Sequence, residues 1–179
     1  MNNLNGINSY ALAVVRTPSD VISFEMLRNA TSCNSGYNTP AGWLYPVSVL
    51  VKKGLVDTSN CNRAHSLSEF FTSSCVPGAS SIANPPLSGF VAAKLCRLCV
   101  GDERGSDVCE YSNRETFFKD EGALRCLQSR RGDVAFVDSS FFLKYIRGKP
   151  SELLDERGAR RLISGSITWR NFFLVVYFL

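Results

Sequence analysis

Residues 10–15 read Tyr10-Ala11-Leu12-Ala13-Val14-Val15, an unbroken apolar run with the length of one β-strand. A second run, Asp133-Val134-Ala135-Phe136-Val137, occurs near the other end of the chain. A continuous apolar run indicates a strand covered on both faces, whereas alternation would indicate one solvated face. Segments with helical features separate the two runs. This alternation predicts an α/β protein with a largely parallel sheet.

The clearest helix start is Thr39-Pro40, which places a hydroxyl at the N-cap and proline at the first helical position. Gly54 is expected to end this helix, and Pro46 to distort its second turn. The apolar side of the helix is expected to consist of Trp43, Leu44, Val47, Leu50 and Val51.

Four further helices are predicted, over Val21–Arg28, Arg63–Phe71, Glu121–Gln128 and Ser139–Ile146. In the first of them Ile22, Phe24 and Met26 are expected to point inward. Thr31–Asn34 is expected to be extended, and Ser73–Gly89 and Cys96–Glu110 to be loops.

The composition is that of an ordinary globular protein of one-domain size, with 179 residues, 45% of them hydrophobic and 20% charged. The net charge of +4 argues against a dedicated nucleic-acid binder, and the apolar content excludes intrinsic disorder. The longest apolar run, Phe172–Leu179, is far shorter than the ~20 residues that cross a bilayer. No nucleic-acid partner and no membrane span are therefore expected.

The two ends of the chain differ from the rest. Residues 1–8 are polar and are expected to be a disordered lead-in, and Met1–Gly6 lacks the pattern of a signal peptide. Residues 158–179 form an atypical apolar segment. Two interpretations of this segment stay open: a native final strand, or sequence read past the true boundary of an exon.

Seven cysteines are many for a cytosolic enzyme, and an odd number leaves at least one without a partner in the chain. Cys96-Arg97-Leu98-Cys99 admits a redox pair, two zinc ligands or structural disulfides. Structural disulfides are favoured, because a loop follows the motif and the sole histidine, His65, lies in a predicted surface helix. Asn29-Ala30-Thr31 is a glycosylation acceptor triplet, which favours a secretory protein.

Five ordered segments resemble the second subdomain of a lobe of the transferrin family, over Ser9–Arg157. They are Tyr10–Val15; Ser32-Cys33 with Pro40-Ala41-Gly42-Trp43; Glu69-Phe70-Phe71 with Ser74–Ala79; Leu95–Asp102; and Gly122–Leu127 with Gly132–Val137. Cys96–Asp102 and Cys109 are most similar to the branch of melanotransferrin and the otolith matrix proteins. The resemblance implies a doubly wound sandwich of the periplasmic-binding-protein type.

The resemblance also implies how the cysteines pair. Cys33 should bond Cys126, Cys75 should bond Cys99, and Cys96 should bond Cys109. Cys61 would remain unpaired, since its family partner lies in a part of the lobe that this chain lacks. Such bonds imply an extracellular or cell-surface location.

Transferrins hold ferric iron with two tyrosinates, an aspartate and a histidine, together with carbonate. The resemblance places Ser9 and Asp120 at the two tyrosine positions, and the aspartate and histidine segments belong to the other subdomain. A serine hydroxyl is a poor metal ligand near neutral pH, whereas Asp120 suits a hard cation such as calcium. The iron site is therefore expected to be degenerate, with no cofactor.

The family's carbonate site is expected to be partly retained. Ser35 keeps the hydroxyl, and the backbone amides of Ala41 and Gly42 lie at a helix start, which favours an anion. Thr39 replaces the family's arginine, so the guanidinium clamp is lost. The alternative interpretation is that Ser35 and Thr39 merely cap the turn.

The resulting hypothesis is a non-enzymatic, transferrin-like extracellular domain with a structural or matrix role and weak calcium or anion contacts. Its partners would be the remainder of a lobe and a matrix, mineral or cell-surface component. Two alternatives stay open. One is an iron transport protein whose other lobe binds the metal, and the other is a thiol oxidoreductase that uses Cys96 and Cys99.

Overall fold

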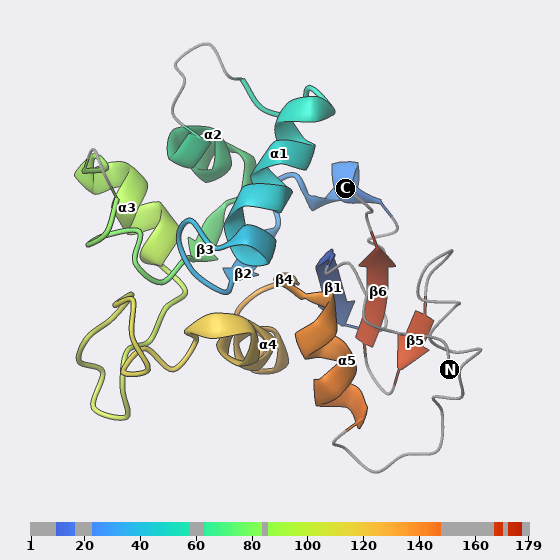
Figure 1. The fold of residues 1–179 in the computed structure, drawn as a ribbon. Helices are drawn as coiled ribbons and strands as arrows, with labels where there is room; N and C mark the ends of the chain where they lie inside the picture. The colour runs from blue at the N-terminus through green and yellow to red at the C-terminus, as the bar shows by residue number, and fades with distance from the viewer. Residues whose placement is uncertain are drawn as a thin grey trace, which may run out of the picture.

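The structure, a computed structural model of the chain, describes residues 10–16, 23–57, 63–83, 86–147, 167–169 and 172–176. Figure 1 shows the arrangement of its helices and strands. In chain order they are β1 (Ala11–Arg16), the 3-10 helix η1 (Phe24–Leu27), β2 (Thr31–Asn34), the π-helical turn η2 (Pro40–Leu44), α1 (Tyr45–Lys52), α2 (Arg63–Phe70), β3 (Ser73–Cys75), α3 (Gly89–Cys96), α4 (Lys119–Gln128), β4 (Val134–Asp138), α5 (Ser139–Arg147), β5 (Ile167–Trp169) and β6 (Phe172–Val176).

The strands form one sheet in the order β3-β2-β4-β1-β6-β5. Strand β2 is parallel to both β3 and β4, but β1 is antiparallel to both β4 and β6, and β5 is antiparallel to β6. The expectation of a largely parallel sheet is therefore wrong, and the sheet is mixed. The apolar run in β1 indicates that both faces of the strand are buried. A strand buried on both faces can pair with its neighbours in a parallel or an antiparallel direction.

Each central strand contributes side chains to both faces of the sheet. In β1, Ala13 and Val15 belong to one buried cluster, whereas Leu12 and Val14 belong to another. Alternate residues of a strand point to opposite faces, so the sheet separates two hydrophobic cores. The continuous apolar run that suggested a doubly covered strand is explained by this arrangement.

Helices cover both faces. The first core contains Val47, Leu67 and Leu95, which come from α1, α2 and α3. The second contains Leu124 of α4 and Phe142 of α5. In Figure 1 the helices α1–α3 accordingly lie on the opposite side of the sheet from α4 and α5. The fold is the α/β sandwich with helices on both faces that the resemblance implies.

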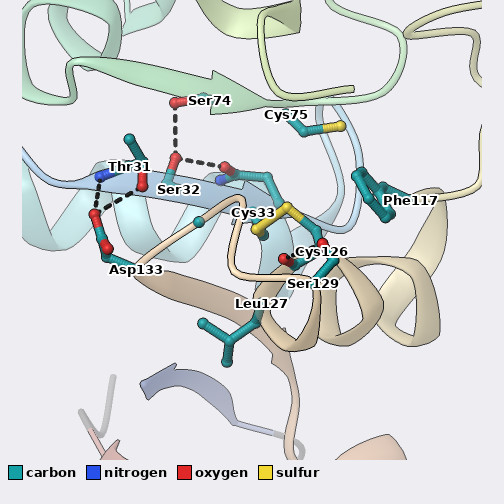
Figure 2. Close-up of a disulfide and its surroundings, with 12 residues drawn as sticks. Thr31, Ser32, Cys33, Ser74, Cys75, Phe117, Cys126, Leu127, Ser129 and Asp133 are labelled. Atoms are coloured by element: carbon teal, nitrogen blue, oxygen red, sulfur yellow. Dashed lines mark hydrogen bonds between the residues drawn. A yellow bond between two sulfur atoms is a disulfide. The ribbon is translucent and has the colours of Figure 1, made fainter. Parts of the chain in front are cut away.

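Three disulfides join the elements, and they are the three pairs that the resemblance implies. Cys33–Cys126 connects β2 to α4 and is drawn in Figure 2. Cys75–Cys99 and Cys96–Cys109 attach the loop after α3 to β3 and to α3 itself. Cys61 lies outside the described residues.

The expectations of an inward Met26 and of a loop beginning at Ser73 are wrong. Met26 is 46% exposed, whereas Phe24 and Leu27 are buried. This segment is a 3-10 helix with three residues per turn, so positions i and i+3 share one side. Ser73–Cys75 is strand β3 and not a loop, because its pairing with β2 is a long-range contact that three serine-rich residues do not signal.

In the helix that begins at Thr39-Pro40, Trp43, Val47 and Leu50 are buried as expected, but Leu44 and Val51 are more than a third exposed. The first turn is π-helical, with Leu44 N donating to Thr39 O. The wider turn rotates Leu44 away from the side that a regular α-helix would bury.

The segment after residue 157 is described only at β5 and β6, and β6 pairs with β1 from Leu12↔Val176 to Arg16↔Phe172. The expected domain boundaries, at residues 8–9 and 157–158, fall outside the described residues. Within the described part of the chain, no helix has the length and apolar character needed to span a bilayer.

Candidate functional site

A cavity of about 400 Å³ lies where the carboxyl ends of β2 and β4 meet the first turns of η2 and α4. Binding sites of open α/β sheets commonly lie beyond the carboxyl ends of parallel strands. Residues from four segments line the cavity: Ser35, Thr39, Pro40, Ala41, Tyr111, Phe118, Lys119, Asp120 and Asp138.

The turn after β2 is closed by two hydroxyls. The Ser35 and Thr39 oxygens lie 3.1 Å apart, and the Thr39 hydroxyl donates to the Gly36 carbonyl at 2.8 Å. Thr39 is the N-cap residue by position, but its side chain makes no capping bond to the helix. The amides of Ala41 and Gly42 lie in the first turn, where N–H groups have no acceptor within the helix.

A side chain from β2 replaces a bond that Pro46 removes. Pro46 has no N–H to donate to the Gly42 carbonyl, four residues earlier in the helix. That carbonyl accepts a hydrogen bond from Asn34 Nδ2 at 2.7 Å, and Asn34 is almost completely buried. The end of β2 is thereby attached to the helix start beside the cavity.

Gly42 lies in close contact with the turn that holds Ser35. A Cβ at Gly42 would lie 2.0 Å from Ser35 Oγ and 2.7 Å from Ser35 N. Real Cβ atoms do not approach other atoms this closely, so any larger residue must displace the turn. Glycine is therefore required here for packing, and not for an unusual backbone angle.

We expect Gly42→Ala to lower the free energy of unfolding by about 1–3 kcal/mol, the usual cost of overpacking. Displacement of Ser35 should also weaken anion binding at the helix start. Chemical denaturation and bicarbonate titration would measure the two effects. Gly89→Ala is the matched control, because a Cβ at Gly89 would meet nothing within 4 Å. Equal stability of the two variants would contradict the packing argument.

Two carboxylates face the cavity. Asp120 lies in the first turn of α4, and Asp138 ends β4; Asp138 N donates to Asp120 Oδ1 at 3.2 Å. Burial raises the pKa of Asp120 above its ordinary value of 3.8. The Asp138 charge adds to this rise, while hydrogen bonds from the Asp138 backbone and the Ser35 side chain oppose it. Asp120 is thus less ready to ionise than a solvated carboxyl.

Lys119 brings a positive charge to the cavity wall. Its backbone N–H donates to Ser35 O at 2.9 Å, and its Nζ lies 5.3 Å from the centroid of the Phe118 ring. Lys119 has a φ of 63°, a conformation uncommon for residues other than glycine. The side chain is exposed, so its attraction for an anion is screened by solvent.

Tyr111 lines the cavity from the loop between Cys109, which is bonded to Cys96, and the start of α4. Its ring packs against Phe118, with centroids 4.8 Å apart and planes at 67°, and it is 39% exposed. Cβ atoms built on Gly36 and Gly78 would lie within 2.9 Å of the ring, so both glycines admit it. The Tyr111 phenol therefore lies at the rim of the cavity, although the two positions where the resemblance implies tyrosines are Ser9 and Asp120.

The structure brings together four of the expected site residues, Ser35, Thr39, Ala41 and Asp120, with Gly42 directly behind Ser35. Ser9 lies outside the described residues. The sequence analysis missed Asp138, Lys119 and Tyr111. Asp138 could have been predicted from the sequence, because it is a polar residue at the carboxyl end of a buried strand, where binding sites commonly lie. Tyr111 lies in an irregular loop, and no sequence pattern marks it as a site residue.

Among the described residues, the cysteines form neither a redox pair between Cys96 and Cys99 nor a metal centre. Cys96 and Cys99 bond to different partners and not to each other. Cys75, Cys99 and Glu115 form the one three-ligand cluster among the described residues, but its two sulfurs are joined in a disulfide. The sole histidine, His65, lines a separate cavity of about 280 Å³.

Comparisons with known proteins give a consistent result. The family model described as Transferrin matches residues 2–163. Human melanotransferrin is 37% identical over 168 residues, covering 87% of this chain and 22% of that protein. Otolith matrix protein 1 of Danio rerio is 36% identical over 152 residues, covering 84% and 41%, and a transferrin of Blaberus discoidalis is 43% identical over 134, covering 72% and 18%. The chain therefore spans at most about two fifths of these relatives.

Proposed function

Because the chain belongs to the transferrin family, we propose that it is a non-enzymatic subdomain of an extracellular protein, with a structural or matrix role. Its cavity takes a small anion weakly and does not bind ferric ion tightly. The remainder of a transferrin-like lobe, and a matrix, mineral or cell-surface component, are its proposed partners.

The observation that carries this proposal is the donor set of the cavity. Ferric ion favours several hard, anionic oxygens, and the family supplies two of them as tyrosinates. Here the corresponding position in α4 holds Asp120, whose carboxylate is tied to the Asp138 backbone and whose pKa is raised by burial. One oxygen of Asp120 is thus already engaged by a backbone N–H, and the cavity offers fewer anionic oxygens than the family's ligand set.

Weak anion binding is supported by the helix start. The Thr39 hydroxyl bonds the turn and not the helix, so the Ala41 and Gly42 amides remain available to a ligand. An anion at such a place gains from the helix dipole and the free N–H groups. Thr39 supplies no charge, and loss of one charge-assisted bond costs about 1.5–3 kcal/mol, which corresponds to roughly a ten- to hundredfold weaker site.

An extracellular location is supported by the three disulfides, since such bonds persist in oxidising compartments. The matrix role is supported by the likeness to proteins named otolith matrix protein 1 in two fishes. The second candidate function is ferric binding within a longer iron transport protein, and the observation that favours it is Tyr111 at the cavity rim.

Titration of the purified protein with ferric iron and bicarbonate separates the two candidates. We expect no tyrosinate-to-iron charge-transfer band, because the rim phenol lacks a second tyrosinate at either expected position. A band that appears in the wild type and disappears in Tyr111→Phe would contradict the proposal and establish the second candidate. Tyr45→Phe is the matched control, since Tyr45 has a similar exposure, 42%, and does not line the cavity.

A further inference from the structure

Asn29-Ala30-Thr31 is the one Asn-x-Ser/Thr triplet in the 179 residues. Asn29 is exposed and lies in the turn between η1 and β2 with a φ of 64°, a conformation that asparagine tolerates well. Its backbone is fixed: its N–H donates to Phe70 O at 2.9 Å, and its carbonyl accepts from Thr72 Oγ1 at 2.6 Å. Because the Asn29 side chain is exposed, the folded chain has room for a large group on it.

The third residue of the triplet is engaged. Thr31 donates to Asp133 Oδ2 twice, from its N–H at 2.9 Å and from its hydroxyl at 2.7 Å, as Figure 2 shows. Asp133 N donates in return to Thr31 O at 2.9 Å. Thr31 also pairs with Ser73 of β3. The hydroxyl that makes the triplet an acceptor is thus committed to the contact between β2 and the start of β4.

We propose that Asn29 carries an N-linked oligosaccharide, and that it is attached before β2 docks between β3 and β4. The Asn29 amide nitrogen forms a bond to the anomeric carbon of a lipid-diphosphate-linked oligosaccharide. The bond from that carbon to the diphosphate breaks, the lipid diphosphate leaves, and the amide loses one proton. The proposal rests on the extracellular location proposed above, because this chemistry belongs to the secretory pathway.

The position of the glycan has a consequence for the cavity. Asn29 precedes β2, whereas Ser35 of the cavity follows the same strand. Six residues of nearly extended chain span about 20 Å. The glycan therefore covers the end of the sheet opposite the cavity and leaves the cavity open to a partner.

The first test directs the full chain into the secretory pathway of cultured cells with a leader peptide. We expect a mass increase that peptide N-glycosidase removes, leaving aspartate at position 29. Asn29→Asp should abolish it, and Asn38→Asp should not; Asn38 is the matched control, being exposed with a φ of 59°. An unmodified Asn29 in a chain with all three disulfides formed would overturn the glycan proposal alone. Failure of those disulfides to form would instead contradict the proposed location.

The second test concerns the order of events. Purified, unglycosylated chain is offered to oligosaccharyltransferase and its lipid-linked donor, once folded and oxidised and once reduced and unfolded. We expect the unfolded chain to be modified more than about tenfold faster, because the folded chain must first open the Thr31–Asp133 contact. Equal rates would overturn the proposed order.

Discussion

Replacing Glu115 by alanine is expected to lower the free energy of unfolding by about 3–5 kcal/mol. Glu115 is 1% exposed, and its two carboxylate oxygens accept hydrogen bonds from four backbone N–H groups. The donors are Val100 at 3.3 Å, Gly101 at 2.8 Å, Cys109 at 2.8 Å and Phe117 at 3.0 Å. Each buried donor left without an acceptor costs about 1–3 kcal/mol, and water admitted to the vacated space recovers part of the sum.

Urea unfolding of the oxidised protein would measure this loss. Hydrogen exchange at Gly101 and Cys109 would show whether the loop opens before the rest of the fold. Glu121→Ala is the control, because Glu121 is 54% exposed and forms only a surface ion pair with Arg125; it should change stability by less than about 1 kcal/mol. Similar losses in the two variants would mean that the four amides do not need Glu115.

Glu115 also connects the loop to the cavity. The segment that it organises carries Tyr111 to the rim and leads into Phe118. Without the four amide contacts, Tyr111 would lose part of the support that places it beside the cavity, and the Cys96–Cys109 disulfide and the Phe118 ring would supply the rest. Stability and the geometry of the rim thus depend on the same buried carboxylate.

The second large effect is expected from removing the disulfide between β2 and α4 with the double change Cys33→Ala and Cys126→Ala. The bond closes a sequence separation of 93 residues, and the chain-entropy model then gives about 4–5 kcal/mol. The same model gives about 3 kcal/mol for Cys96–Cys109, whose separation is 13. Both sulfurs of Cys33–Cys126 lie in the second core, so the loss of packing adds to the entropic effect.

Denaturation of both double-alanine variants beside the wild type would check the order of the two effects. We expect the Cys33–Cys126 variant to be the less stable. The Cys96–Cys109 variant is the matched control, since it also loses two sulfurs and one bond. A greater loss in the control would show that the loop-closure argument does not govern this fold.

Much of the fold was predictable from local sequence. The runs in β1 and β4 predicted strands buried on both faces, and Thr39-Pro40 and Gly54 predicted the bounds of the longest helical segment. These features depend on side-chain hydrophobicity and backbone preferences within a few residues, so the sequence displays them directly. The disulfide pairing came from the resemblance to a family and not from spacing, because seven cysteines admit many pairings.

The candidate site was predictable only in part. Ser35, Thr39, Ala41 and Asp120 were expected from the family's motifs, and they meet in one cavity. Tyr111 was not expected, since a loop residue reaches a site through the path of the chain, here set by Cys96–Cys109 and Glu115. The glycines at 36 and 78 admit its ring, but they carry no sequence signal for it.

The sequence by itself therefore determined the α/β class, the buried strands and most helices. Only the tertiary structure decided the direction of β1, the strand at Ser73–Cys75 and the meeting of Asp120, Asp138 and Tyr111. The physical reason is the sequence separation over which each kind of interaction acts. Hydrophobic periodicity and helix signals act between near neighbours, whereas strand direction and cavity composition follow from contacts between segments far apart in the chain.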